Sequence, residues 1–165
     1  RDSVMGKCDS EPPVFVNTVK VQSAKDMYDA VIERADSMDI IVKAAAVADY
    51  RPKNVSSEKV KKQDGNMSIE LERTDDILKT LGERKNGQFI CGFSMETENM
   101  LENSRKKLEK KNCDMIVANN LKQDGAGFGG NTNIVTLITK DDEVQLEKMT
   151  KDEVAEKIFD FILSR

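Results

Sequence analysis

The sequence predicts an α/β domain with a largely parallel sheet, an inserted hairpin and a C-terminal antiparallel hairpin. Short apolar runs typical of strands alternate with segments whose apolar residues recur at helical spacing. The first strand, helix and strand fall within about thirty residues, which is the size of a parallel crossover unit. Later segments carry the turn residues of hairpins instead.

The crossover unit begins with an expected strand over residues 16–21, where apolar residues alternate. Ser23 and Asp26 make a capping-box-like start, and the apolar residues that follow lie at helical spacing. Residues 40–46 are mostly apolar, which is typical of a strand buried on both faces.

The inserted hairpin is expected around Asp64 and Gly65, because this pair favours a tight turn between strands at 60–63 and 67–71. Thr74 can then cap a short helix. The apolar residues of that helix are Ile77, Leu78 and Leu81.

The remaining strands and helices follow the same two periodicities. In chain order we expect a strand at residues 89–93, a charged helix at 98–111, a buried strand at 115–118 and a terminal hairpin with strands at 134–139 and 144–148. Thr150 and Glu153 form a capping box for a last helix. Its apolar stripe is Val154, Ile158, Phe161 and Ile162. The glycine-rich residues 124–133 predict a loop.

Composition excludes several classes of partner. The chain has 165 residues, 38% hydrophobic and 34% charged, with a net charge of −4. This charge provides no positive field, so we expect neither nucleic acid nor a membrane surface as partner. No apolar run approaches the ~20 residues of a membrane span. The 3 cysteines lack CxxC spacing, which argues against a disulfide framework or a zinc site and favours a cytoplasmic location.

The sequence contains 0 histidines. Within these residues this excludes a Ser–His or Cys–His nucleophile pair and a histidine-ligated metal. Chemistry here must use lysine, carboxylate, amide and backbone groups, or a bound nucleotide with its metal ion.

The segment AAAVADYRP, residues 44–52, is the first candidate site. Small residues at the carboxyl end of a strand let a ligand approach the backbone, and this edge is where open α/β sheets bind ligands. Asp49 can accept hydrogen bonds from a base amino group or a ribose hydroxyl. The alternative is close helix–sheet packing beside an exposed aspartate.

Lysines provide the next candidates. Lys59, Lys61 and Lys62 lie in EKVKKQ, where strand alternation would place Lys59 and Lys61 on one face, and such a flap could close over a polyphosphate. Lys107 and Lys111 are spaced i, i+4 on a helix and could hold phosphate groups. The alternatives are a solvated strand edge and the polar side of an amphipathic helix.

In CGFSMET, Phe93 could place its ring against a planar base, with Glu96 nearby. A core aromatic residue followed by a carboxylate at a helix start is the alternative. Cys91 lies in an apolar run and is expected to be an inert core residue.

Taken in order, AAAVADYRP, EKVKK, TDDIL, GFSMET, VANN and GFGGNTN resemble the bacterial phosphopantothenoylcysteine synthetase family from about residue 16 to the end. The resemblance implies a Rossmann-like three-layer fold and a ligase of coenzyme A biosynthesis. Such enzymes use CTP to convert the carboxylate of 4′-phosphopantothenate into an acyl-cytidylate, releasing pyrophosphate. The amine of cysteine then forms the amide and releases CMP.

The resemblance also implies site residues. Lys59 would be the catalytic flap lysine and would contact CTP, with Mg²⁺ carried by the triphosphate rather than by protein ligands. The other nucleotide-binding residues would be Ala45, Ala46, Asp49, Asp75, Asp76, Ile77, Leu78, Phe93, Lys107 and Lys111. A homodimer is expected, fused to or working with phosphopantothenoylcysteine decarboxylase.

The chain departs from the family pattern in places. Asp75 stands where the family has proline, which adds a carboxylate beside the proposed phosphate-binding turn. We expect residues 1–165 to be a single synthetase domain that lacks its first strand, glycine-rich turn and following segment. Residues 1–15 would be a connecting loop, and residues 1–165 by themselves would lack synthetase activity.

Two other functions fit parts of the pattern. The same pocket could serve a nucleotide-binding or assembly domain without turnover. A nicotinamide-dependent oxidoreductase is disfavoured, because no GxGxxG follows a strand.

Overall fold

The computed structural model describes residues 1–8, 11–62, 64–96, 98–120 and 130–165. The chain forms two compact units. The first unit comprises Arg1–Arg34 and Ala45–Ile77, and the second comprises Ala35–Ala44 and Leu78–Arg165.

In the first unit, strand β1 (Asp2–Met5) pairs in parallel with β2 (Asn17–Lys20). The strand expected at 16–21 is confirmed by β2, whereas β1 lies in the segment expected to be a connecting loop. That expectation was wrong, because a strand this short becomes visible only through its pairing, with Val4 opposite Val19.

Helix α1 (Ala24–Ala35) follows β2 with the predicted start. The backbone N–H of Asp26 donates to Ser23 Oγ at 3.1 Å, and the Ser23 N–H donates to an Asp26 carboxylate oxygen at 2.9 Å. This reciprocal pair satisfies N–H groups that the first turn of a helix leaves without partners.

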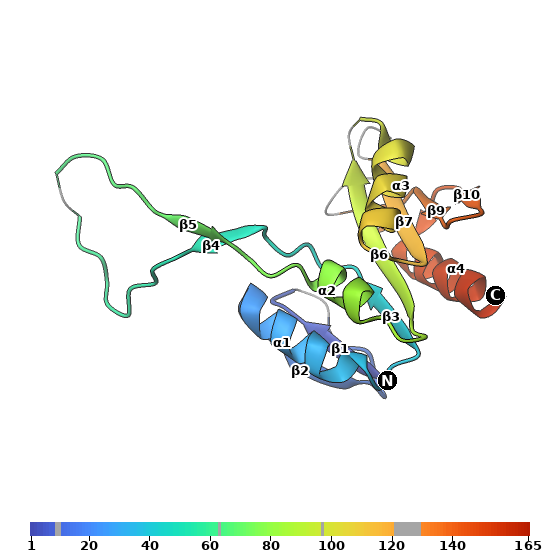
Figure 1. Cartoon of the computed structure of the whole chain (residues 1–165), viewed down its shortest axis with the longest axis horizontal. Helices are drawn as coiled ribbons and strands as arrows, with labels where there is room; N and C mark the ends of the chain where they lie inside the picture. The colour runs from blue at the N-terminus through green and yellow to red at the C-terminus, as the bar shows by residue number, and fades with distance from the viewer. Residues whose placement is uncertain (9–10, 63, 97, 121–129) are drawn as a thin grey trace. The chain divides into compact units, whose positions relative to one another are not determined.

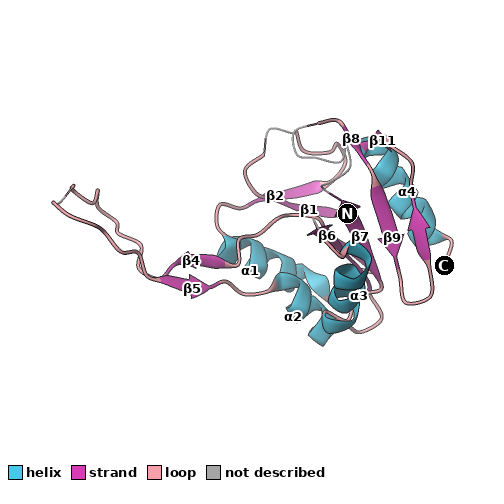
Figure 2. Ribbon diagram, turned by 90° about the horizontal axis from the view of Figure 1, so that it is seen from above, coloured by secondary structure: helices cyan, strands magenta, loops and turns pink. Residues whose placement is uncertain are grey.

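The inserted hairpin is longer than predicted. Strand β4 (Tyr50–Pro52) pairs antiparallel with β5 (Leu71–Arg73). Residues 60–62 and 67–70 form no strand, while residue 63 lies outside the described residues. Residues 53–62 and 64–70 run out from this strand pair as long loop segments (Figures 1 and 2). We call residues 50–62 and 64–73 the arm.

Cross-strand ion pairs explain the register of the arm. Arg51 lies opposite Glu72 with Nε and Oε1 2.8 Å apart, and Lys53 contacts Glu70 at 2.7 Å. The Asp-Gly pair had predicted that a tight turn sets the strand pairing. These charged pairs at the base of the arm align β4 and β5 instead.

The second unit contains a five-stranded sheet in the order β10-β9-β7-β6-β3. Strands β3, β6 and β7 are parallel, and β9 and β10 add the predicted antiparallel hairpin. The bounds are Ile40–Lys43, Phe89–Glu96, Met115–Asn120, Val135–Ile138 and Glu143–Gln145 for β3, β6, β7, β9 and β10. A further short pair joins β8 (Thr132–Asn133) to β11 (Met149–Thr150). Of the glycine-rich loop expected at 124–133, residues 124–129 lie outside the described residues.

Strand β3 is less buried than predicted. It ends at Lys43 and is an edge strand of this sheet, paired with β6. Val42 is 37% exposed, and the alanines that follow β3 are exposed as well. The apolar run signalled a strand correctly, but burial on both faces requires neighbours that a sequence pattern does not reveal. Strand β2 pairs with β1 in a separate sheet, so the predicted crossover partners, β2 and β3, have different hydrogen-bonding partners.

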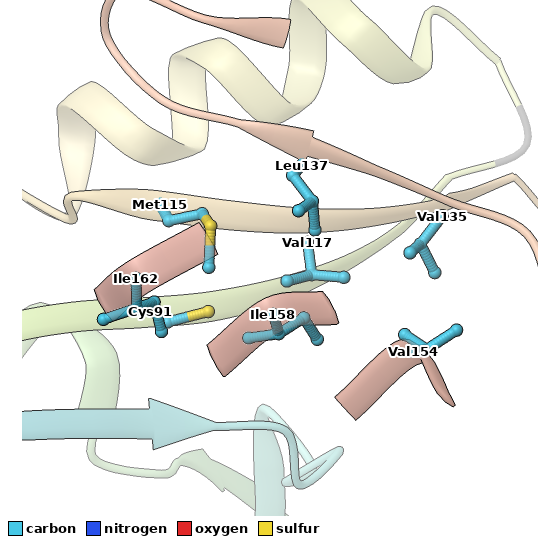
Figure 3. Close-up of a cluster of buried hydrophobic side chains, with 8 residues drawn as sticks. All are labelled: Cys91, Met115, Val117, Val135, Leu137, Val154, Ile158 and Ile162. Atoms are coloured by element: carbon cyan, nitrogen blue, oxygen red, sulfur yellow. The ribbon is translucent and has the colours of Figure 1, made fainter. Parts of the chain in front are cut away.

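Helices cover both faces of the five-stranded sheet. Helix α4 (Lys151–Leu163) packs its predicted stripe against one face, where Cys91, Met115, Val117, Val135 and Leu137 form the core with Val154, Ile158 and Ile162 (Figure 3). Helix α3 (Met100–Lys110) lies along β6 and β7 on the other face, together with the part of α2 (Ile77–Arg84) from Leu78 onward. The second unit therefore has the three-layer arrangement that was expected.

Helix α4 begins with the predicted capping box. Thr150 Oγ1 accepts from the Glu153 N–H at 3.3 Å, and Glu153 Oε2 accepts from the Thr150 N–H at 2.8 Å. We expect Thr150→Ala to lower the free energy of unfolding by about 1 kcal/mol, because the Glu153 N–H loses its acceptor. Urea unfolding measures this loss, and Lys151→Ala, at the exposed neighbouring position, is the control. Equal losses in both variants would contradict the assignment.

Candidate functional site

The segment that follows β3 carries the first group of candidate residues. Ala45, Ala46 and Asp49 belong to the first unit and are exposed. The Thr74 N–H donates to the Asp49 carbonyl at 3.0 Å, and the Thr74 hydroxyl donates to the Ala48 carbonyl at 2.5 Å. These bonds hold the backbone at the base of the arm and leave the Asp49 carboxylate at the surface.

Thr74 had been predicted to cap α2, but it does not. Helix α2 begins at Ile77, and the Thr74 hydroxyl is used at the base of the arm. The pKa of the neighbouring Arg73 is raised, chiefly by its hydrogen bond to the Tyr50 hydroxyl and further by the Asp49 carboxylate. Asp49 therefore lies in the field of a guanidinium at the base of the arm.

The next four candidate residues lie at the start of α2 and differ in burial. Asp75 and Asp76 are exposed, whereas Ile77 and Leu78 are 3% and 4% exposed. The side chains of Ile77 and Leu78 are thus core residues, and only their main chain is suited to contact a ligand. Asp75 also helps to raise the pKa of Lys25, for which a hydrogen bond to Asp29 is the largest cause.

The lysines of the arm are exposed, but they do not lie on a strand. Lys59, Lys61 and Lys62 follow a turn in which Ser56 Oγ donates to the Glu58 carbonyl at 2.8 Å. The argument that strand alternation places Lys59 and Lys61 on one face is therefore wrong. Neither Lys59 nor Asp49 makes a side-chain hydrogen bond or ion pair within the described part of the arm and its base.

In the second unit, Phe93 and Lys107 are brought together, although not through the aromatic ring. Lys107 Nζ donates to the main-chain carbonyl of Phe93 at 2.8 Å. The Phe93 ring packs against the core cluster on the α4 face of the sheet, whereas α3 lies on the opposite face. Phe93 is thus partly a core residue, as its alternative interpretation predicted, and its carbonyl positions Lys107.

Lys111 lies one turn beyond Lys107, about 6 Å further along the helix axis. Its N–H donates to the Lys107 carbonyl at 3.0 Å at the C-terminal end of α3. Its own carbonyl lies beside Gly82 of α2. Since α3 connects the end of β6 to the start of β7, Lys111 is further than Lys107 from the carboxyl ends of these strands.

Two features of the second unit were not predicted as site elements. Asn119, at the end of β7, is 7% exposed, and its Oδ1 has no hydrogen-bond partner among the described residues. The polar pair that ends the apolar run in VANN was a visible signal for it. The second feature is a buried hydroxyl pair, Ser94 and Ser104, which no local pattern in the sequence marks.

Cys91 is a core residue, as expected, and so is Cys113. Burial is the main cause that raises the pKa of Cys91 from an ordinary 9.0 to about 12, and that of Cys113 to about 11. Both thiols are therefore protonated in the folded chain at pH 8, and protonated thiols react slowly with alkylating reagents.

We predict that iodoacetamide at pH 8 modifies the exposed Cys8 first and leaves Cys91 and Cys113 unmodified until urea is added. Peptide mass spectrometry gives the order. Modification of Cys91 at the rate of Cys8 in the folded protein would contradict the burial argument.

The same pKa values predict that the free energy of unfolding falls as the pH rises from about 9 towards 12, because unfolded thiols ionise before folded ones.

Among the described residues, no group of three or more histidine, cysteine, aspartate or glutamate side chains is placed to hold a metal ion. Within the same residues, no helix is long and apolar enough to cross a membrane.

A family model described as the DNA/pantothenate metabolism flavoprotein C-terminal domain matches residues 2–165. The match includes the N-terminal segment, which had been expected to lie outside the family resemblance. The coenzyme A biosynthesis bifunctional protein CoaBC of Bacillus subtilis is 53% identical over 131 residues, which cover 79% of this chain and 32% of that protein. Its counterpart in Vibrio cholerae is 38% identical over 162 residues, covering 96% and 41%.

A further relative, named cysteine/cysteine sulfinic acid decarboxylase, from an unknown prokaryotic organism, is 43% identical over 151 residues, covering 90% of this chain and 42% of that protein. The chain thus spans between 32% and 42% of the length of these curated relatives.

Among solved structures, the C-terminal domain of CoaBC superposes with a TM-score of 0.81 at 45% identity, covering 98% of this chain and 71% of that one. A DNA/pantothenate metabolism flavoprotein from Streptococcus pneumoniae has a TM-score of 0.80 at 21% identity, covering 99% and 80%, and supports the fold alone.

Proposed function

Because this chain belongs to the DNA/pantothenate metabolism flavoprotein C-terminal domain family, we propose that it is the phosphopantothenate–cysteine ligase region of a coenzyme A biosynthesis enzyme. The observation that carries the proposal is the 53% identity to the coenzyme A biosynthesis protein of Bacillus subtilis. The ordered motifs from AAAVADYRP to VANN support the ligase assignment within that pathway.

The reaction would proceed in two steps. A carboxylate oxygen of 4′-phosphopantothenate attacks the α-phosphorus of CTP, forming a C–O–P link and releasing pyrophosphate. The cysteine amine then attacks the acyl carbon, forming the amide and expelling CMP, while the amine proton passes to solvent or a base. Neither step requires histidine, because positioning and neutralisation of phosphate charge supply most of the catalysis.

In this proposal, lysines neutralise phosphate charge and an aspartate binds the base or the ribose. Lys59, on the arm, would neutralise charge on the triphosphate and on the acyl-cytidylate. Lys107 uses one N–H on the Phe93 carbonyl and keeps two donors for phosphate oxygens. The exposed Asp49 carboxylate would accept from the base amino group or the ribose. Mg²⁺ would bind through triphosphate oxygens and neutralise charge, since this ion retains phosphate and water ligands readily.

Other proposed contacts are assigned by the resemblance and limited by burial. Ala45, Ala46, Asp75 and Asp76 are exposed, so each presents part of its surface to a ligand. Ile77 and Leu78 would contribute main-chain N–H groups at the start of α2, where a helix favours anions. The carboxylate of Asp75 opposes that preference and would weaken phosphate binding there. Lys111 would bind phosphate further along α3.

We also propose a homodimer and cooperation with phosphopantothenoylcysteine decarboxylase. The arm exposes apolar side chains that a second copy could cover, namely Val55, Val60, Met67, Ile69 and Leu71. The relatives named bifunctional are more than twice the length that this chain matches, which supports a fused partner region. Sedimentation of the full-length gene product tests the dimer, and a monomer at every concentration would contradict it.

The decisive assay incubates the full-length gene product with 4′-phosphopantothenate, cysteine, CTP and Mg²⁺. Pyrophosphate, CMP and the amide should appear together, and ATP in place of CTP should give less product. With ¹⁸O in the phosphopantothenate carboxylate, one label should appear in CMP, because the acyl-cytidylate transfers that oxygen.

The other outcomes separate the competing functions. Thermal stabilisation by CTP without pyrophosphate would favour a nucleotide-binding module. Release of CO₂ from cysteine in the absence of CTP would favour the activity named for the decarboxylase relative. No response to CTP at all would overturn the ligase proposal.

A further inference from the structure

The contact between α3 and the sheet is unusually polar for a helix that covers a core. Of the 11 residues of α3, Ser104 and Leu108 are the buried ones. Ser104 is 0% exposed, and its hydroxyl lies 2.7 Å from that of Ser94 on β6, which is 2% exposed. A single apolar anchor restrains the rotation of a helix weakly, because apolar contacts have little directional preference.

The hydroxyl pair lies directly beside the contact of Lys107. Ser94 follows Phe93 on β6, and Lys107 follows Ser104 by about one turn on α3. Consecutive residues of the strand therefore bind consecutive turns of the helix. Ser94 binds Ser104 through side chains at 2.7 Å, and the Phe93 carbonyl accepts from Lys107 Nζ at 2.8 Å.

We propose that the Ser94–Ser104 pair is a positioning device that sets the rotation of α3, so that the ammonium of Lys107 is presented to the triphosphate. A rotation of about 30° would move a point about 6 Å from the helix axis by roughly 3 Å, which is enough to break a hydrogen bond. This inference rests on the proposed ligase function and adds residues that would act through Lys107 without touching the nucleotide.

Stability alone is a weak explanation for the pair. Replacing both partners of a buried hydrogen bond by apolar groups of similar shape is often nearly neutral, whereas removing one partner leaves a buried hydroxyl unsatisfied. Directionality is what a hydroxyl pair supplies and two methyl groups lack. This difference provides the test, because fold stability and CTP binding should respond differently to the double replacement.

The experiment compares Ser94→Ala/Ser104→Ala, Lys107→Ala and the triple variant in the full-length gene product. We expect the serine double variant to keep its melting temperature within a few degrees and its KM for cysteine unchanged. Its KM for CTP should rise about fivefold, and that of Lys107→Ala about tenfold. The triple variant should match Lys107→Ala, because the serines act through that lysine.

Matched controls separate positioning from general destabilisation. Ile162→Val, in helix α4 on the opposite face of the sheet, should lower the melting temperature without changing the KM for CTP. Lys110→Ala removes an exposed charge from the same helix and should leave the KM for CTP within about twofold of wild type.

Specific outcomes overturn the inference. If the effects of the serine and lysine replacements on the KM for CTP multiply in full, the serines do not act through Lys107. An unchanged KM for CTP in the serine double variant would likewise show that the pair is only a packing contact. Absence of turnover and of CTP binding in the wild type would overturn the proposed function itself, and with it this inference.

Discussion

Replacing Lys59 by glutamine should lower kcat for pyrophosphate release by about a hundredfold, which is typical for loss of one preorganised charged donor to a transition state. Stability should not change, because Lys59 is exposed and makes no side-chain hydrogen bond or ion pair within the described residues of the arm. Glutamine keeps much of the length and some donor capacity, so the variant isolates the positive charge.

The control for this prediction lies close by on the same loop. Lys62→Gln removes an equal charge from an exposed position, and we expect kcat within about threefold of wild type, as for a screened surface charge. Steady-state kinetics and urea unfolding of both variants complete the test. Equal loss of kcat in both would reduce the role of Lys59 to general electrostatics. Unfolding of the Lys59 variant would show that the assigned role is wrong.

The largest effect on stability is expected at Gly82. A Cβ atom there would lie 1.8 Å from the Lys111 carbonyl oxygen and 2.8 Å from its carbonyl carbon. These are backbone atoms, so no side-chain rotation relieves the overlap, and α2 and α3 would have to separate. The hydrogen bond from Asn112 Nδ2 to the Gly82 carbonyl, at 2.8 Å, joins the same two helices.

We therefore expect Gly82→Ala to lower the free energy of unfolding by about 3 kcal/mol, the upper part of the range for overpacking. This loss opposes the gain of about 1 kcal/mol that alanine normally brings to a helix interior. Urea denaturation at pH 7 measures the difference, and a variant as stable as wild type would refute the close approach.

Gly92→Ala provides the contrast. A Cβ atom at Gly92 would lie 2.7 Å from Leu78 Cδ2 and 3.0 Å from Ile116 Cδ1, which are the ends of side chains that can rotate. We expect a loss of about 1 kcal/mol. A larger loss at Gly92 than at Gly82 would mean that side-chain packing limits this unit more than backbone contact does.

The capping boxes show which features local sequence predicts well. Ser23 with Asp26 and Thr150 with Glu153 start α1 and α4 with the expected reciprocal hydrogen bonds. A cap depends on residues three positions apart, and an amphipathic stripe depends on a period of about 3.6 residues. Both are local properties, so they were readable without knowledge of the fold.

The arm and the candidate site show where local sequence was insufficient. Asp64 and Gly65 predicted a tight hairpin, but charged pairs between distant residues, including Arg51 with Glu72, align the strands at the base instead. Thr74 is of a residue type that often caps helices, yet its hydroxyl donates to the carbonyl of Ala48. In each case a partner more than twenty positions away in the sequence competed with the local interaction.

Local sequence patterns predicted the α/β class, the helices, the strands of the five-stranded sheet and the ordered motifs that identify the family. Long-range contacts make β3 an edge strand, turn the Phe93 ring toward the core while its carbonyl holds Lys107, and join α3 to β6 through a serine pair. Periodicity and capping are set by neighbours along the chain. Burial and side-chain partners are set by residues that only folding brings together.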